Sequence, residues 1–291
     1  MKKLILLIIP LVVIVFLSHN LSLRKTRERE IAWRELGEKI EKKLRVFGGK
    51  AGILLKDLKT RQEISFNKKD SFPAASLIKV PIMLACFYAG REGRLNLEEK
   101  IVLHSGDRVG GSGILKNLPP GRVFTVERLI ELMITVSDNT ATNILIEKLG
   151  FDYLNSCFKR MSLKNTHLLR KMMDFRERRA GRDNFTNAED IAYLLEKIYL
   201  KRFLSQKISA QCLHYLLNQK YRDRIPAKLP AGIKVAHKTG LERKICHDAG
   251  LVFGPKGDFI IVVLTQGEEI RKAKRFIADI SSTVYDYYSH F

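Results

Sequence analysis

A serine and a lysine three positions apart, Ser76 and Lys79, have the spacing of a nucleophile and its base on one face of a helix. A serine hydroxyl is a weak nucleophile until a neighbouring group accepts its proton. Pro73 and two alanines precede the apolar run from Val80 to Phe87, which predicts a helix beginning near Ser76. Ser76 would then lie at the positive end of the helix dipole, where backbone N–H groups can stabilise an oxyanion.

Two further polar triplets follow the serine–lysine pair along the chain. Ser137-Asp138-Asn139 begins 61 residues after Ser76, and Lys238-Thr239-Gly240 begins 101 residues after Ser137. Each triplet alone has an ordinary structural explanation, because the first suits a helix end with an N-cap and Lys238 suits a solvated strand end. Together, in this order and at this spacing, the three motifs favour one catalytic site.

Apolar periodicity around these motifs predicts strands at both ends of the chain and helices between them. A hairpin is expected from 51–58 and 63–66, and further strands at 233–238, 249–253 and 259–265. Helices are expected at 24–45, 76–88, 125–136, 140–149, 188–200, 209–218 and 270–287. Thr125 is the expected N-cap of one helix, and Thr186 with Glu189 forms the expected capping box of another. The pattern predicts an α+β fold: an antiparallel sheet built from both chain ends and flanked by helices, with an all-helical lobe inserted at about 70–225.

The three motifs in this setting resemble those of class A serine β-lactamases and the related penicillin-recognising transpeptidases. The resemblance covers residues 51–287, and further matching stretches lie at 136–143, 236–240 and 248–250. It implies that the first motif heads a helix, that the second lies at a break between helices of the lobe, and that the third ends an inner strand. The cleft between sheet and lobe is where such a site is expected.

The resemblance assigns catalytic roles to three residues. Ser76 would attack the carbonyl carbon of an amide or lactam and form an acyl-enzyme. Lys79 would accept the serine proton, with its pKa lowered by burial and by the neighbouring Lys238. Ser137 would relay a proton to the leaving nitrogen, which is the general-acid step of amide cleavage.

Substrate binding is assigned, by the same resemblance, to residues of the second and third motifs. Asn139 would bind the substrate side chain or hold the base lysine. Lys238 would supply a positive charge for a substrate carboxylate, with Thr239 donating a hydrogen bond beside it. Gly240 would let the substrate backbone approach the strand. The N–H of Leu241, with that of the nucleophile, would form the oxyanion hole.

The chain departs from this resemblance in the basic stretch 159–183, which we expect to be a structured surface loop. Class A β-lactamases carry a glutamate here, with an asparagine shortly after it, to activate the water that frees the enzyme. If Arg170 and Asp183 form the ion pair that closes the loop, Met172 stands where the glutamate is expected. Glu177 is the candidate base through a shifted loop, and a solvated charged turn is the alternative. Acylation of the serine is therefore better supported than its release.

A second departure concerns the arginine that often assists carboxylate binding in this family. It has no clear counterpart: Arg243 and Lys244 are only nearby, and His247 stands at the approximate place. The run Cys246-His247-Asp248 looks like a set of metal ligands but lies at an expected strand start. We expect no metal and no cofactor.

The four cysteines are widely spaced, with no pair separated by two residues; they are Cys86, Cys157, Cys212 and Cys246. An oxidising compartment would permit disulfides, but nothing in the spacing fixes a pairing. We expect single buried cysteines that pack as small apolar residues.

The N-terminus has a basic start followed by fourteen residues without a charged or polar side chain, from Leu4 to Leu17. The small residues of a signal cleavage site are missing, and the stretch extends through Leu23 to about one bilayer span. We favour an uncleaved membrane anchor over a cleaved signal peptide, with residues 1–30 as the anchor segment and 31–291 as the enzyme domain. Either alternative places the domain outside the cytoplasm.

The balance of 52 Lys and Arg against 31 Asp and Glu gives a net charge of +21, which favours an anionic partner such as lipid headgroups or acidic wall polymer. No nucleic-acid-binding module is evident, so we expect no nucleic-acid partner. We expect a monomeric hydrolase that opens β-lactam rings. The alternatives are a D-alanyl peptidase, or another amide or ester hydrolase, with slow β-lactam deacylation, and a non-catalytic sensor of wall peptide or β-lactam.

Overall fold

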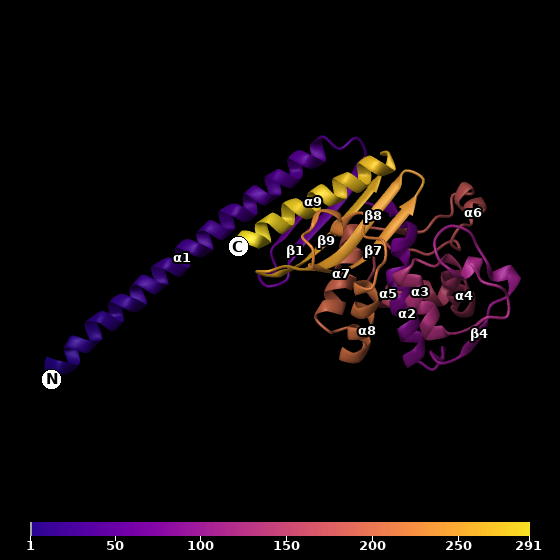
Figure 1. Ribbon diagram of the computed structural model, residues 1–291, viewed down its shortest axis with the longest axis horizontal. Helices are drawn as coiled ribbons and strands as arrows, with labels where there is room; N and C mark the ends of the chain where they lie inside the picture. The colour runs from indigo at the N-terminus through magenta and orange to yellow at the C-terminus, as the bar shows by residue number, and fades with distance from the viewer. Residues whose placement is uncertain (1) are drawn as a thin grey trace.

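A five-stranded antiparallel sheet organises the computed structural model, which describes the backbone of residues 2–291 and the side chains of residues 23–291 (Figure 1). The strand order is β2-β1-β9-β8-β7, so strands from both chain ends pair within one sheet. The strands are β1 (Lys50–Asp57), β2 (Glu63–Phe66), β7 (Lys234–Glu242), β8 (Ile245–Phe253) and β9 (Asp258–Gln266). The predicted α+β class is confirmed.

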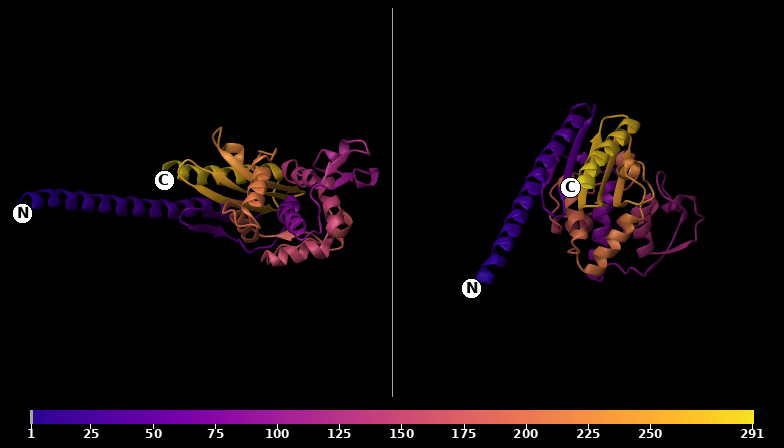
Figure 2. Two further views of the ribbon diagram at one scale, coloured as in Figure 1. Left: turned by 90° about the horizontal axis from the view of Figure 1, so that it is seen from below. Right: turned by 60° about the vertical axis from the view of Figure 1, so that its left-hand side comes forward.

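Two long terminal helices cover one face of the sheet, α1 (Lys2–Arg45) and α9 (Ile270–His290) (Figure 2). The helical lobe covers the other face and comes from the chain between β2 and β7. Its helices are α2 (Lys79–Arg91), α3 (Val126–Thr135), α4 (Asn139–Leu149), α5 (Phe151–Arg160), α6 (Phe175–Arg179), α7 (Ala188–Tyr199) and α8 (Gln206–Leu217). Short 3₁₀ helices are η1 (Ala75–Ile78), η2 (Ser105–Asp107), η3 (Leu115–Asn117) and η4 (Ile225–Lys228), and small ladders pair β3 (Phe72–Pro73) with β6 (Phe185–Thr186) and β4 (Lys100–Val102) with β5 (Val123–Thr125).

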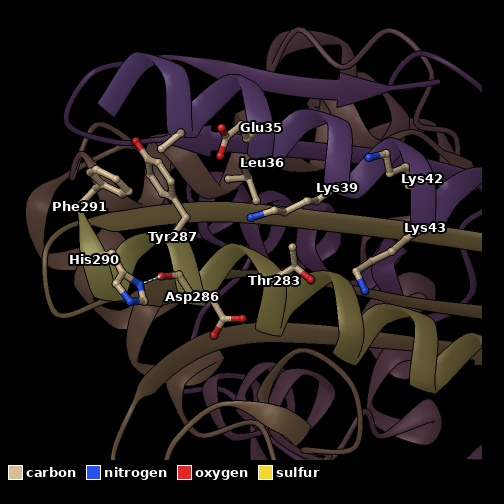
Figure 3. A pocket seen from close by; sticks show the side chains of 11 residues that line it. Glu35, Leu36, Lys39, Lys42, Lys43, Thr283, Asp286, Tyr287, His290 and Phe291 are labelled. Atoms are coloured by element: carbon tan, nitrogen blue, oxygen red, sulfur yellow. Dashed lines mark hydrogen bonds between the residues drawn. The ribbon is translucent and has the colours of Figure 1, made fainter. Parts of the chain in front are cut away.

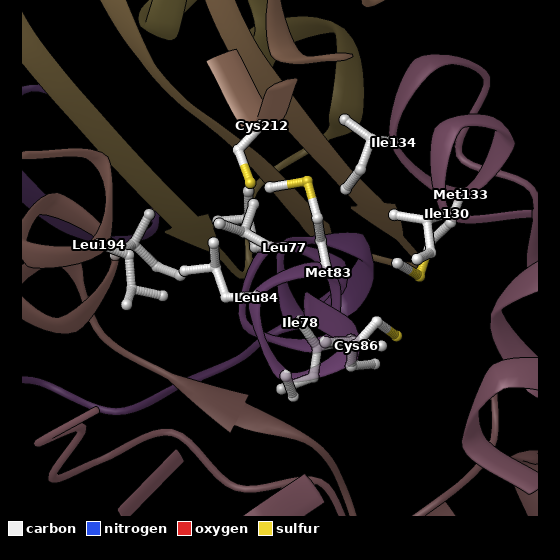
Figure 4. Packing of buried hydrophobic residues seen from close by; sticks show 14 of the residues in the cluster. Leu77, Ile78, Met83, Leu84, Cys86, Ile130, Met133, Ile134, Leu194 and Cys212 are labelled. Carbon is white, nitrogen blue, oxygen red and sulfur yellow. The ribbon is translucent and has the colours of Figure 1, made fainter. Parts of the chain in front are cut away.

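Helix α2 runs through the centre of the lobe core (Figure 4). It is apolar on every side, which is the pattern of a fully buried helix rather than an amphipathic one. Met83, Leu84 and Cys86 contribute to a cluster with Ile130 of α3 and Leu194 of α7. All four cysteines are buried and unpaired, as predicted. This packing fixes the start of α2, and with it the η1 turn, against the sheet.

The contact between α1 and α9 leaves a groove on the face of the sheet opposite the lobe (Figure 3). Its volume is about 580 Å³, and Leu36, Lys39 and Tyr287 are among its lining residues. Trp33 packs edge-on against Tyr287 with ring centroids 5.4 Å apart. This groove is separated by the sheet from the residues of the three sequence motifs.

Several element boundaries differ from the sequence prediction. Strand β7 continues through Lys238-Thr239-Gly240 to Glu242 and lies at the edge of the sheet, so the prediction that the third motif ends an inner strand is wrong. Polar side chains near the end of β7 interrupt the apolar pattern from which the strand was predicted, because they face the candidate site rather than the hydrophobic core. Helix α7 begins at Ala188 as predicted, but the predicted capping box is wrong: Asn187, not Thr186, is the N-cap and accepts from the N–H of Asp190. The predicted N-cap Thr125 is confirmed.

In the part of the chain whose side chains are described, no helix has the length and apolar character needed to cross a membrane. The side chains of the apolar stretch 4–17, on which the predicted anchor depends, lie outside the described residues.

Candidate active site

Ser76 lies in the η1 turn immediately before α2, at the place where the sequence predicted a helix start. The segment before it is fixed on both sides: Pro73 pairs with Phe185, and the N–H of Ala74 donates to the carbonyl of Asn184 at 2.7 Å. Ala75 has a φ of 44°, a left-handed conformation that is strained for a residue with a side chain. Strand β7 packs against η1. Ser76, the predicted nucleophile, is therefore held by a constrained turn beside the third motif.

Lys79 is completely buried, and its Nζ has three acceptors within the second motif. Its Nζ lies 2.7 Å from Asn139 Oδ1, 2.8 Å from the carbonyl oxygen of Ser137 and 3.2 Å from Ser137 Oγ. Burial lowers the pKa of Lys79 to about 7, against the partial opposing effect of Asp138. A lysine with this pKa is a competent proton acceptor near neutral pH.

Ser137 joins the second motif to the third. Lys238 Nζ lies 3.0 Å from Ser137 Oγ and 2.8 Å from the carbonyl oxygen of Thr239. Burial, and then the charge of Lys79, lower the pKa of Lys238 well below its usual value. Ser137 has a φ of 54°, so a strained backbone places its hydroxyl between the two lysines.

Asp138 holds the second motif in this position. It caps α4 by accepting from the N–H of Ala141, and its other oxygen accepts from the N–H groups of Ile114 and Leu115 at 2.7 and 2.9 Å. Gly113 passes so close that a Cβ there would lie 2.4 Å from the Asp138 carboxylate. The N-cap explanation of this triplet is confirmed, and the cap also fixes Ser137 and Asn139 beside the two lysines.

The side-chain amide of Asn139 is oriented by the protein on both sides. Its oxygen accepts from Lys79, and its nitrogen donates to the carbonyl of Gly110 at 3.0 Å. Of the two predicted roles of Asn139, holding the lysine is the one these contacts support. Thr239 and Gly240 lie in β7, and Leu241 beyond them has an exposed side chain. A Cβ at Gly240 would lie 3.4 Å from the carbonyl oxygen of Ala74, so β7 passes close to the nucleophile's segment.

The loop between α5 and β6 is closed by the ion pair that the sequence predicted. Arg170 Nε lies 2.6 Å from Asp183 Oδ1, and both side chains are nearly inaccessible. A third partner was missed: Glu242, at the end of β7, pairs with Arg170 at 2.8 Å and with Arg178 at 2.7 Å. This cluster ties the loop to the strand that carries Lys238. In the sequence, Glu242 is visible only as an acidic residue four positions after Lys238. Nothing in the neighbouring sequence links it to Arg170, which lies 72 residues earlier.

Met172 occupies the position two residues after Arg170, where the resemblance implies a glutamate. Its N–H donates to Asn143 Oδ1 at 2.8 Å, and Asn143 Nδ2 donates to its carbonyl at 3.1 Å. The Met172 side chain is buried. Met173 has a φ of 67°, and its sulfur would lie 2.9 Å from a Cβ placed on Gly111. Met172 therefore packs in the hydrophobic core of the lobe, while Met173 lies beside Gly111, close to Asn139.

Glu177, the candidate base, is held at the loop surface in an ion pair with Arg182. The hydrogen bond from Arg182 is the largest cause of the lowered pKa of Glu177. A carboxylate held in this way is a weak proton acceptor. Asp174 caps α6 by accepting from the N–H of Glu177. The contacts of both carboxylates are thus internal to the loop, as in the alternative of a solvated charged turn.

His247 does not lie where a substrate carboxylate could meet it. It is buried, its Nε2 lies 2.8 Å from the carbonyl oxygen of Pro73, and the N–H of Thr265 donates to its Nδ1 at 3.0 Å. These partners require a neutral ring protonated on Nε2. Burial lowers the pKa of His247 to about 4. The histidine joins β9 to the segment that precedes the nucleophile.

Arg224 is a buried cation that sequence reasoning missed. Its Nε lies 3.2 Å from Cys246 Sγ, and its Nη1 lies 2.9 Å from Asp223. Its charge is among the causes that lower the pKa of Lys238, so it adds positive potential behind the third motif. Asp248, beside Cys246 and His247 in the sequence, contacts His237: Asp248 Oδ1 lies 2.9 Å from His237 Nδ1. Within the part of the chain that the structure describes, no group of three or more His, Cys, Asp or Glu side chains is arranged to hold a metal ion.

The fold and the site together define a serine acyl-transfer enzyme of the penicillin-recognising class, with the nucleophile, two buried lysines and a bridging serine. A family model described as the Beta-lactamase enzyme family matches residues 35–288, and the chain belongs to this family.

Similar proteins agree with this assignment. The chain is 24% identical over 270 residues to beta-lactamase VEB-1 from Pseudomonas aeruginosa, covering 86% of this chain and 89% of that protein. Among solved structures, PBP-A is 29% identical with a TM-score of 0.81, over 88% of this chain and 97% of that one. A beta-lactamase from Sphaerobacter thermophilus is also 29% identical, with a TM-score of 0.77, over 84% of this chain and 92% of that one.

Proposed function

We propose that this chain is a serine hydrolase that opens β-lactam rings through an acyl-enzyme on Ser76. The observation that carries the proposal is the buried cluster in which Lys79 and Lys238 both bond to Ser137, beside the turn that bears Ser76. Membership of the Beta-lactamase enzyme family and the likeness to VEB-1 support the same activity.

The first half-reaction follows from the positions of these groups. Lys79, half neutral at its pKa of about 7 and mostly neutral above it, accepts the proton of Ser76 as the serine oxygen adds to the lactam carbonyl. The N–H groups of Ser76 and Leu241 stabilise the resulting oxyanion. Ser137 passes a proton to the ring nitrogen while the carbon–nitrogen bond breaks, and it is reprotonated from the neighbouring lysines.

Substrate orientation is assigned to the third motif. A β-lactam carries a carboxylate near the ring nitrogen, and Lys238 with the hydroxyl of Thr239 is placed to bind it. The bound carboxylate raises the pKa of Lys238, because an opposite charge favours the ammonium form. Arg224, buried behind the strand, adds to the positive potential at this point.

The second half-reaction, hydrolysis of the acyl-enzyme, has the weaker support. Water must be deprotonated to attack the ester, and Met172 stands where a carboxylate base is expected. This observation favours the second candidate function, a D-alanyl peptidase or other amide or ester hydrolase whose β-lactam acyl-enzyme is long-lived. A mutant of the related PBP-A has been solved as an acyl-enzyme complex with penicillin G, 29% identical to this chain with a TM-score of 0.81.

We also propose that the protein is monomeric and acts outside the cytoplasm, held to the membrane by its first thirty residues. The uncharged run from Leu4 to Leu17 after a basic start supports this placement. Full-length protein should remain in the membrane fraction after alkaline carbonate extraction, and release into the soluble fraction would contradict the anchor.

The enzymatic proposal is tested with penicillin and a chromogenic cephalosporin. Intact mass should show one acyl group per wild-type chain and none on Ser76→Ala, while Ser71→Ala, which alters an exposed serine five residues earlier, should be acylated normally. Sustained cephalosporin turnover supports the β-lactamase, and stoichiometric acylation without turnover supports the second candidate. No acylation of the wild type would contradict both and leave the non-catalytic sensor.

A further inference from the structure

We infer that the end of the domain nearest the N-terminal apolar segment, here called the basal surface, contacts an anionic lipid leaflet, and that the acylation site points away from it. The inference rests on the membrane anchor proposed above. It adds a contact surface within the folded domain and a fixed orientation of the site. The evidence comes from the described residues that gather at this end.

Helix α1 connects the apolar segment to the domain without a flexible linker. Arg29 bonds α1 to the domain: Nη2 lies 3.0 Å from Asp57 Oδ2, and Nε lies 3.2 Å from the hydroxyl of Tyr287. Leu23, the last residue of the apolar stretch, precedes Arg29 by six positions, or about 9 Å along a helix. The domain therefore begins within about 9 Å of the point where the chain leaves the bilayer.

Two turns of the sheet and the end of α9 meet at this same level. Asp57, which binds Arg29, opens the β1–β2 turn and also accepts from the hydroxyl of Tyr288 at 2.9 Å. In the β8–β9 turn, Lys256 Nζ donates to the carbonyl of His290, the last residue of α9, at 2.7 Å. Figure 1 shows α9 ending beside α1 on the side toward the chain's N-terminus, with α6 at the opposite side. These contacts define the basal surface.

The end of α7 joins the same surface from the lobe side. The hydroxyl of Tyr199, the last residue of α7, donates to Asp258 Oδ2 at 2.9 Å, and Asp258 follows the β8–β9 turn directly. Lys201 and Arg202 come immediately after α7 and are exposed. Segments far apart in sequence thus bring their ends to one level.

Exposed cations dominate the basal surface. They are Arg24, Lys25 and Arg27 of α1 and Lys59, Arg61, Lys201, Arg202 and Lys256 of the loops. Exposed carboxylates at this end are fewer: Glu28, which pairs with Arg24, Glu30 and Asp286. Asp57 pairs with Arg29, and Glu196 pairs with Lys56 and Arg61. Cations at the edge of an apolar segment fit the negative potential of an anionic leaflet, which acts over about a Debye length.

Strand direction places the acylation site at the other end of the sheet. The nine residues of β8 separate the β8–β9 turn from the β7–β8 turn, a length of about 30 Å. Lys238 and Gly240 lie in the half of β7 next to the β7–β8 turn, and Glu242 closes that half against the loop. With the basal surface on the lipid, the cleft faces away from the membrane toward substrate.

Energy transfer to the lipid surface tests this orientation. Full-length protein is inserted into vesicles of phosphatidylcholine, with or without phosphatidylglycerol, that carry an acceptor dye on the headgroups. One donor is attached at Lys256→Cys, on the basal surface, and another at Arg179→Cys, in α6; the native cysteines are buried and do not compete. Transfer should be several-fold stronger from position 256, and phosphatidylglycerol should increase that difference in low salt.

Charge reversal separates the surface from the anchor. The basal variant carries glutamate at three exposed positions, Lys59, Lys201 and Arg202, and the matched control carries it at Arg122, Lys164 and Arg176 of the lobe. The basal variant should lose the effect of phosphatidylglycerol, and the control should keep it. Equal energy transfer from both donors, with the protein still resisting carbonate extraction from the vesicles, would overturn this inference while leaving the anchor intact. Extraction by carbonate would overturn the anchor, and with it the inference, while leaving acylation of Ser76 untouched.

Discussion

Lys79 and Lys238 donate to the same oxygen, with their Nζ atoms 3.2 and 3.0 Å from the hydroxyl of Ser137. Both side chains are completely buried. Burial is the main cause that lowers the pKa of each lysine, and the charge of Lys79 lowers the pKa of Lys238 further. The consequence is a site that releases a proton near neutral pH without an imidazole.

The acylation rate should rise with pH through about 7 and level off above it. Lys79 must be neutral to accept the serine proton, and its pKa is about 7, so the active fraction grows as the lysine deprotonates. The check is the second-order rate of penicillin acylation, followed by quenched intact mass from mildly acidic to mildly alkaline pH. Lys79→Ala should be slower by roughly 10²–10⁴-fold, with this inflection absent. A rate that falls as pH rises through 7 would contradict Lys79 as the base.

Met172→Glu should speed release of the acyl-enzyme. Asn143 holds the backbone of residue 172 through both its N–H and its carbonyl, so the loop can keep its path while the side chain changes. A carboxylate there would supply the missing general base, an effect of roughly 10²-fold or more on deacylation. The measurement is decay of the penicilloyl-enzyme mass after removal of free penicillin. Met172→Gln is the matched control, since it has the same shape without a base, and equal rates for the two variants would contradict the explanation.

Features encoded by neighbouring residues were predicted well. The Ser76 turn followed by α2, the cap at Thr125 and the hairpin of β1 with β2 depend on local spacing and turn chemistry. The Arg170–Asp183 ion pair was also predicted, because the resemblance identified the residues at the two ends of the loop. These are cases in which sequence distance is short or a motif fixes the alignment.

The distant contacts of Glu242 and His247 were not predicted, since no local pattern or motif records them. Glu242 lies 72 residues from its partner Arg170, and His247 lies 174 residues from Pro73. In the sequence Glu242 is one charge in a polar run and His247 one histidine in a strand. Only the antiparallel register of β7 and β8 carries both side chains to the segments around the nucleophile.

Removing the Glu242 carboxylate should destabilise the domain and loosen the loop. Arg170 is 1% exposed and Glu242 10% exposed, so Glu242→Ala leaves a buried guanidinium with one carboxylate fewer. Breaking a buried pair of this kind costs about 3 kcal/mol. The free energy of unfolding in denaturant gives the magnitude, and faster amide exchange across 170–183 would locate the effect. Arg243→Ala, at the exposed neighbour, should stay within about 0.5 kcal/mol, and equal stability of the two variants would rule out a structural role for the cluster.

Replacing His247 by phenylalanine should slow acylation, whereas glutamine should preserve much of it. Phenylalanine leaves the Pro73 carbonyl and the Thr265 N–H buried without their partner on residue 247. The side-chain amide of glutamine can still donate to the Pro73 carbonyl. Pro73 leads into the turn that carries Ser76. A pH readout identifies the neutral ring itself. The pKa of His247 in the folded protein, about 4, lies below its ordinary value of 6.5, so between these values the unfolded chain binds more protons and stability is lost as pH falls. Thermal unfolding of His247→Gln should lack this part of the acid sensitivity. If both variants acylate at the wild-type rate, His247 does not position Ser76, because the turn then keeps its geometry without the bond to Pro73.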